Sequence, residues 1–216
     1  MSYIFDKLMM IPMVLIALMF HELAHGWVSM KLGDPTPKYQ GRMTLNPLAH
    51  LDPVGTLLMI ITGFGWAKPV EINPRYYKDP KKGMALTALA GPVTNFLLAL
   101  VAMLIYGVIF VIYSKTGIFA NAMNTIGYVV KRFAMLNLCF MVFNFIPIPP
   151  LDGSRILGVF LSNRAYFKLQ QYERYSFIVI ILLSASGAFD WIIGTGVGIV
   201  FEYMSLGLEM LVNLVI

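Results

Sequence analysis

The chain has 216 residues, of which 58% are hydrophobic and only 12% are charged, and its formal net charge is +5. A soluble domain of this size is about half apolar and a quarter charged, so the composition excludes a soluble globule and a disordered chain and predicts a polytopic membrane protein. The single cysteine, Cys139, excludes an intrachain disulfide and a cysteine-based metal site.

Five apolar segments predict an all-α polytopic membrane protein with about five transmembrane helices. They cover residues 8–30, 84–113, 133–147, 176–188 and 191–216. A helical span needs about 20 apolar residues. The third and fourth segments therefore cross only if their flanking residues take part.

The connection between the first two spans, residues 31–83, is rich in Pro and Gly and too polar to cross as a whole. Within it, residues 41–46 and 66–72 alternate enough between apolar and polar side chains to predict short β-strands. Residues 54–64 are apolar but too few to cross. These features predict a membrane-dipping loop, whose irregular backbone must be buried in protein or face water.

Lysine and arginine residues are unevenly divided between the two sides of the predicted bundle. Residues 31–83 hold eight and residues 148–175 hold four, against four on the opposite side. Because positive residues concentrate in cytoplasmic loops, we expect a multi-pass protein of the cell membrane with both basic connections in the cytosol. The N-terminus is then outside and, after five crossings, the C-terminus inside. The basic balance reflects topology and indicates no nucleic-acid partner.

Three ionisable residues lie inside the first apolar segment, in the run FHELAH at residues 20–25. Such groups are costly in a membrane and usually functional. Residues four apart share a helix face, so His21 and His25 can direct two imidazoles at one metal ion, with Glu22 beside them. This is the HExxH pattern, in which zinc acidifies water and the glutamate takes its proton. The alternative is a polar helix face that lines a path for protons or metal ions.

A catalytic zinc ion usually has a third protein ligand and one open position. His21 and His25 lie about 8–14 Å from the end of the first span, so the third ligand must lie near the same end of another span or in a loop that re-enters there. Asp152 meets this condition, since it follows the third span after helix-breaking prolines; alternatively, it caps a short helix that begins near Gly153. The candidate third ligands in the chain are His50, Asp52, Glu71, Asp79, Asp152, Glu173 and Asp190.

His50 and Asp52 are the main rivals, because they precede the apolar residues 54–64 and can fold toward the site. We favour a pair of Asn/Asp-Pro turns, with the histidine solvated or behind the metal ligands. Asp190 is disfavoured because the predicted topology places it on the far side of the membrane.

Two motifs together resemble the site-2 protease family of intramembrane zinc metalloproteases. One is HELAH at residues 21–25, and the other is NxxPxPxxDG, which begins at Asn144 and contains Asp152. GPVTN, which ends at Asn95, resembles the family's GPxxN motif. Residues 45–55 and 65–73 resemble short bacterial and archaeal members. The resemblance runs from about residue 19 to residue 155 and is that of a minimal member without a PDZ domain.

The resemblance implies one Zn²⁺ per chain, held by His21, His25 and Asp152, with Glu22 as the general base. The implied reaction is hydrolysis of a peptide bond within or near the transmembrane segment of a membrane-protein substrate. The site is expected near the cytosolic face, where only a short inlet for water is needed.

The resemblance also implies catalytic roles for Asn95 and Asn144, although an amide in a span can equally link two helices. Residues 66–72 are expected to pair with an unwound substrate by strand addition. We expect one membrane-embedded metalloprotease domain over residues 1–216, with a catalytic core at about 8–160 and C-terminal spans at about 175–216, surrounded by the lipid bilayer. Two alternatives stay open, a metal-ion transporter and a catalytically silent scaffold, and the oligomeric state is undetermined.

Overall fold

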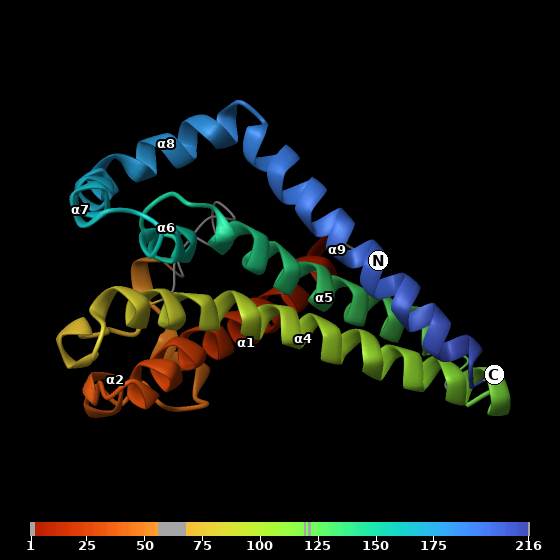
Figure 1. Ribbon diagram of the computed structural model, residues 1–216. Coiled ribbons are helices and arrows are strands. Elements are labelled where there is room, and N and C mark those ends of the chain that lie inside the picture. Colours follow the sequence, from red (N-terminus) through yellow and green to blue (C-terminus); the bar gives the residue numbers. More distant parts are fainter. Residues whose placement is uncertain (1–2, 56–67, 119, 121, 216) are drawn as a thin grey trace.

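The computed structural model describes residues 3–55, 68–118, 120 and 122–215, which are mostly helical (Figure 1). The long helices are α1 (Tyr3–Lys31), α4 (Pro80–Thr116), α5 (Met123–Phe145) and α9 (Ala188–Asn213). The short ones are α2 (Thr36–Tyr39), α6 (Asp152–Gly158), α7 (Asn163–Gln171) and α8 (Glu173–Ala185). Two 3₁₀ turns, η1 (Pro47–His50) and η2 (Pro74–Tyr76), lie in the connection from α1 to α4.

In the described part of the chain, four helices are long and apolar enough to cross a membrane: α1 from Met9 onward, α4, α5 and α9. The predicted count of five is not confirmed. The fourth predicted segment forms most of α8, whose 13 residues extend about 20 Å and fall short of a hydrocarbon core of about 30 Å. With an even number of crossings, both chain ends lie on the same side of the membrane. The prediction of a cytosolic C-terminus, which depends on five crossings, is therefore not supported. In Figure 1 both ends lie away from α2 and α7.

The first predicted strand, residues 41–46, is a turn instead. Gly41 has a φ of +66°, which reverses the chain rather than extending it. Asn46 then caps η1 by accepting a hydrogen bond from the Leu48 amide at 3.1 Å. The alternating pattern was therefore a sequence of turn residues and not one face of a sheet.

The second predicted strand, residues 66–72, also forms no strand over the part that the structure describes, residues 68–72. Pro69 has no amide hydrogen to donate to a ladder, and the Val70 amide donates to a side chain instead. Residues 66 and 67, and the predicted apolar dip beyond Gly55, lie outside the described residues.

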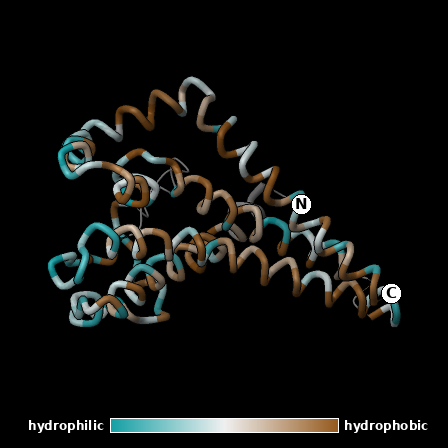
Figure 2. The backbone as a smooth tube through the Cα atoms, in the orientation of Figure 1, coloured by the Kyte–Doolittle hydropathy of each residue, from teal (hydrophilic) through white to brown (hydrophobic). Residues whose placement is uncertain are grey.

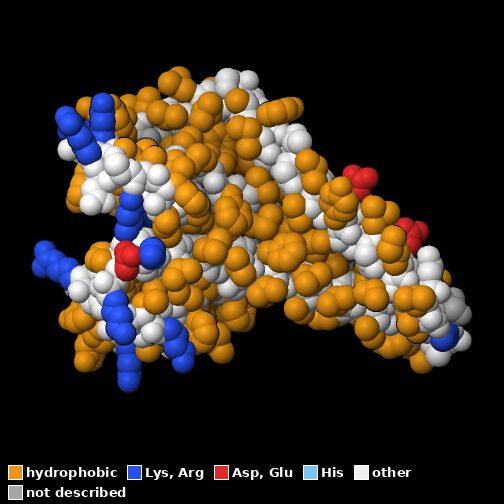
Figure 3. Space-filling view, viewed as in Figure 1, with side chains coloured by type: hydrophobic (Ala, Val, Ile, Leu, Met, Phe, Trp, Pro, Cys, Tyr) orange, Lys and Arg blue, Asp and Glu red, His pale blue; other side chains and the backbone are white. Residues whose placement is uncertain are grey.

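The central packing combines small alanines with larger apolar side chains. Ala99 and Ala102 of α4, Ala134 and Leu138 of α5, and Val197 of α9 form a buried cluster, in which small residues let the helices approach closely. Most residues of the long helices are hydrophobic (Figure 2). On the face shown in Figure 3, Lys and Arg side chains gather at the end that carries α2 and α7. This distribution is compatible with a membrane location.

Candidate metal centre

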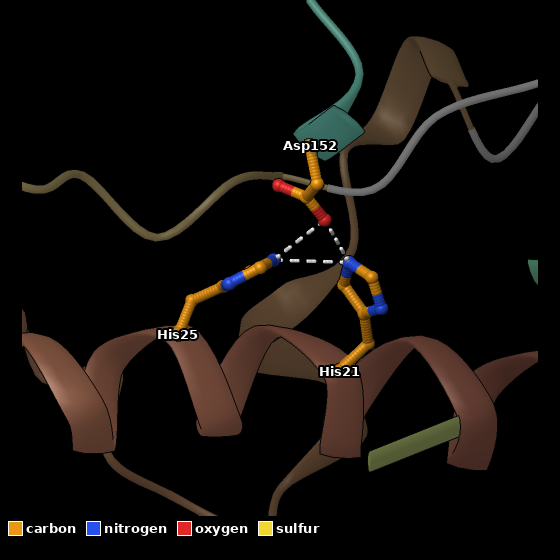
Figure 4. Close-up of side chains that lie close together, drawn as sticks. All are labelled: His21, His25 and Asp152. Atoms are coloured by element: carbon orange, nitrogen blue, oxygen red, sulfur yellow. Dashed lines mark hydrogen bonds and ion pairs between the residues drawn. The ribbon is translucent and has the colours of Figure 1, made fainter. Parts of the chain in front are cut away.

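His21, His25 and Asp152 lie together, although they come from distant parts of the chain (Figure 4). The histidines stand one turn apart on α1, and Asp152 is the first residue of α6. The Oδ2 atom of Asp152 lies 3.2 Å from the Nε2 atom of His21 and 3.3 Å from that of His25, and the two Nε2 atoms are 3.0 Å apart. All three side chains are buried. No other His, Cys, Asp or Glu joins this group within the described residues.

The local sequence explains how Asp152 reaches the histidines. α5 ends at Phe145, and α6 then starts so close to it that a Cβ atom on Gly153 would lie 2.6 Å from the Ile146 carbonyl oxygen. Only glycine permits this approach. The helix-capping alternative does not match the structure, because Leu151 is the N-cap residue and no side chain caps α6.

The outer ring nitrogens fix which nitrogen of each imidazole carries the proton. The Nδ1 atom of His21 lies 2.6 Å from the Oδ1 atom of Asn95, and that of His25 lies 2.7 Å from the Thr87 carbonyl oxygen. The Asn95 amide nitrogen faces the carbonyl of Ala17, which leaves its oxygen for His21. Oxygen acceptors require a hydrogen on each Nδ1, so both Nε2 atoms of the neutral rings carry lone pairs.

These assignments leave three lone pairs facing one another at the centre of the group. The Asp152 carboxylate is buried between the two imidazoles. The Oδ2 atom of the carboxylate has no hydrogen-bond partner within the described residues. Three buried lone pairs repel unless a cation lies among them. The donor set therefore fits a metal ion.

The same arrangement fits zinc in its chemistry and its space. Two imidazole nitrogens and one carboxylate oxygen are a catalytic zinc set that leaves a position open, and bonds of about 2.0–2.2 Å place neighbouring ligand atoms about 3.4 Å apart. Gly91 of α4 makes room for the rings, since a Cβ atom there would lie 2.6 Å from the Nε2 atom of His21 and 2.6 Å from the Cε1 atom of His25. The glycine of GPVTN thus borders the site.

Glu22, the predicted general base, lies beside the ligand pair on α1 and is half-buried. Its Oε2 atom accepts a hydrogen bond from the Val70 amide at 2.8 Å. The segment predicted to pair with substrate therefore also holds one oxygen of this carboxylate.

The two predicted asparagines occupy different places. Asn95 is fully buried and accepts the His21 hydrogen bond, so it orients one side chain of the group of three. Asn144 is half-buried near the end of α5, and its side-chain amide donates to the Phe140 carbonyl at 3.0 Å. No hydrogen bond links Asn144 to the three ligands in the described part of the chain.

The rival ligands lie outside the group of three. His50 is buried, and its Nε2 atom lies 3.0 Å from the Thr44 carbonyl oxygen, to which it donates. Asp52 accepts from the Gly55 amide at 2.8 Å at the start of helical residues 53–55, where it has the position of a helix cap. None of Glu71, Asp79, Glu173 and Asp190 joins the three ligands.

Sequence reasoning missed three buried residues that stand behind the ligands: Asp34, Tyr77 and Thr87. Burial raises the pKa of the Asp34 carboxyl, but hydrogen bonds from Thr36, Asn73 and Ser29 lower it by more. The pKa therefore lies below its ordinary value. The only local sequence feature that marks Asp34 is the proline that follows it. Asp52 and Asp79 are also followed by proline, so this feature does not single out Asp34.

The profile of peptidase family M50 matches residues 9–186 of the chain. YwhC of Bacillus subtilis (strain 168), which is named as a zinc metalloprotease, is 39% identical over 191 residues, or 84% of each chain. Rip2 of Mycolicibacterium smegmatis, which carries the same kind of name, is 24% identical over 88% of this chain and 71% of its own. The zinc metalloprotease MJ0392 of Methanocaldococcus jannaschii is 28% identical over 70% of this chain and 34% of its own. No solved structure gives a significant match.

Proposed function

Because the chain belongs to peptidase family M50, the site-2 protease family, we propose that it cleaves peptide bonds within or near transmembrane segments of membrane proteins. Its relatives YwhC and Rip2 are named zinc metalloproteases. One observation carries the proposal. Two Nε2 atoms and one carboxylate oxygen converge within 3.0–3.3 Å on α1, a helix that can itself cross a membrane.

His21, His25 and Asp152 would hold one zinc ion per chain. Zinc supplies a Lewis acid that polarises a peptide carbonyl and lowers the pKa of water to about 7. Glu22 then acts as the general base, which takes a proton from the attacking water and gives it to the leaving amine. Because the Val70 amide holds Oε2 of Glu22, we assign the proton transfer to Oε1.

Asn95 and Asn144 have different proposed roles. Asn95 keeps the hydrogen of His21 on Nδ1 and so keeps Nε2 available as a ligand. Asn144 precedes the turn to Asp152 and, as in the family motif it matches, would donate to the developing oxyanion. The Phe140 carbonyl takes one of the two amide hydrogens, and the other is the one assigned to that role.

The bilayer location is part of the proposal. The basic residues of 31–83 and 148–175 support a cytosolic side for the connections around the site. His25 then lies about 9 Å from the cytosolic end of α1 at Lys31, within reach of a short water inlet. With four spans, both chain ends lie outside.

The test uses the full chain, purified and reconstituted, with a panel of single-span membrane proteins as substrates. We expect one zinc per wild-type chain by elemental analysis and cleavage of at least one substrate. Glu22→Gln should keep zinc and lose cleavage, whereas His21→Ala should lose both. Normal turnover by Glu22→Gln would remove Glu22 as the base, and a wild-type protein that holds no zinc would remove the hydrolase.

A metal-ion transporter is less consistent with the arrangement of polar groups. Such a protein needs polar side chains along several spans, whereas buried Asn95 and Asn137 are bonded to each other and to the His21 side of the metal group. Zinc flux into proteoliposomes that hold wild-type protein would favour the transporter.

A further inference from the structure

A fully buried carboxylate lies just beyond α1, outside the metal group. Asp34 accepts three hydrogen bonds: from the Ser29 hydroxyl at 2.8 Å, the Thr36 amide at 2.9 Å and the Asn73 amide at 2.8 Å. A buried charge needs such partners. Two of the three donors lead to the site along separate routes.

The first route runs through hydroxyl groups to His25. The Ser29 hydroxyl oxygen lies 2.6 Å from the Tyr77 hydroxyl, which lies 3.1 Å from the Thr87 hydroxyl. Because Asp34 only accepts, the chain has one direction: Thr87 donates to Tyr77, Tyr77 to Ser29, and Ser29 to the carboxylate. The Thr87 carbonyl, in turn, accepts the Nδ1 hydrogen of His25 at 2.7 Å.

The second route runs through the backbone to Glu22. Asp34 holds the Asn73 amide, and three residues earlier in the same segment the Val70 amide holds the Glu22 carboxylate. Val70 and Tyr77 are buried as well, so both ends of this segment are fixed against α1 and α4. The position of the Val70 amide therefore depends on the anchor at Asn73.

We propose that Asp34 is a positioning residue for this site: through Tyr77 and Thr87 it orients the ligand His25, and through Asn73 and Val70 it orients the base Glu22. The proposal rests on the proposed function, because it assigns His25 to zinc and Glu22 to proton transfer. Groups behind metal ligands typically change metal affinity by about 10- to 100-fold when they are altered. Asp34 is expected to lie in that range although it touches neither His25 nor Glu22.

Asp34→Asn tests the proposal, since the carboxamide nitrogen must oppose either the Asn73 amide or the Thr36 amide. We expect zinc affinity, measured by competition with a chelator, to fall about 10-fold. In zinc-saturated protein, kcat should fall by a similar factor with KM unchanged, because Glu22 is displaced and substrate binding is not. Asp79→Asn is the matched control. Asp79 also precedes a proline, and it caps α4, but its side chain is exposed. In the described part of the chain, no hydrogen bond or ion pair joins that side chain to Asp34 or to the group of three.

Two further measurements separate positioning from a general loss of structure. Tyr77→Phe interrupts only the first route and should lower zinc affinity more than kcat. The double variant with Asp34→Asn should lose no more zinc affinity than Asp34→Asn alone, since both changes act on one chain of hydrogen bonds. If Asp34→Asn fails to fold, Tyr77→Phe and Ser29→Ala still test the first route.

Wild-type zinc affinity and kcat in folded Asp34→Asn, or additive losses in the double variant, would overturn the proposal. A wild-type protein that binds zinc and cleaves nothing would remove the hydrolase instead, and the zinc affinities would still test the route from Asp34 to His25.

Discussion

The helices around the histidine pair differ from the two C-terminal helices in what holds them in place. Around α1, α4 and α6, buried polar groups form directional contacts: His21 with Asn95, His25 with Thr87, and Asp152 with both rings. α8 and α9 instead expose large apolar side chains, including Leu182 at 63% and Trp191 at 72%.

This difference explains why the family motifs lie only in the first region. A directional contact or a close approach admits one or two residue types, whereas an apolar outer face accepts any side chain of suitable hydropathy. We therefore expect substitutions around the histidine pair to change zinc binding, and matched substitutions in α9 to leave it unchanged.

The largest contrast should come from Asp152→Ala and Asp190→Ala. The first removes one of three ligand atoms, so zinc affinity should fall by more than about 100-fold, beyond the usual effect of supporting residues. The second removes an exposed carboxylate at the start of α9, and zinc affinity should stay within error of wild type. Chelator competition measures both. Retained affinity in Asp152→Ala would mean that another group supplies the third ligand.

Gly91→Ala and Gly198→Ala give the next contrast, with the same added methyl group in two spans. At Gly91 the new Cβ atom meets the rings of both histidines, so zinc affinity should fall by about 10- to 100-fold. At Gly198 a Cβ atom meets nothing within 4 Å, so zinc binding should stay the same and stability should rise by up to about 1 kcal/mol. Equal zinc affinity in the two variants would contradict the close packing of α4 on α1.

The sequence predicts site residues where a short motif contains an ionisable residue inside an apolar span. His21 and His25 are one helical turn apart, and an ionisable pair in a span has few structural explanations, so the pair could be predicted. Asp152 followed from its depth and the prolines before it. The supporting residues did not, because Asp34 and Tyr77 come together only through tertiary structure and Asp34 shares its local pattern with Asp52 and Asp79.

The errors in the fold have a similar physical origin. Hydropathy finds apolar segments well, but at residues 176–188 it does not distinguish a span from a shorter apolar helix that ends at Ala185. The alternation at residues 41–46 arises equally from a strand and from a series of turns, and Gly41 decides for the turn.

Asn137→Leu and Asn213→Leu test a weaker effect, through a residue two hydrogen bonds from the metal group. Asn137 accepts from the Asn95 amide at 3.0 Å and donates to the Phe133 carbonyl at 2.8 Å. Without this side chain one hydrogen of the buried Asn95 amide loses its acceptor, which costs about 1–3 kcal/mol of unfolding free energy, and zinc affinity should fall up to about 10-fold as the Asn95 amide loses its orientation. Asn213 is exposed at the end of α9, so Asn213→Leu should change neither. Thermal unfolding and chelator competition measure the pair.

The smallest effect is the pH dependence that Asp34 contributes. Its pKa in the folded protein lies below the ordinary value of 3.8, because its three hydrogen bonds outweigh its burial. A depressed pKa means that the unfolded chain binds the proton more readily, so the stabilisation is complete above pH 4 or so and is lost as the pH falls through the folded pKa. The difference in Tm between wild type and Asp34→Asn should therefore be large near neutral pH and shrink below about pH 4. A difference that stays constant from neutral to acid pH would mean that Asp34 acts through its shape alone, and the two routes to His25 and Glu22 would then not depend on its charge.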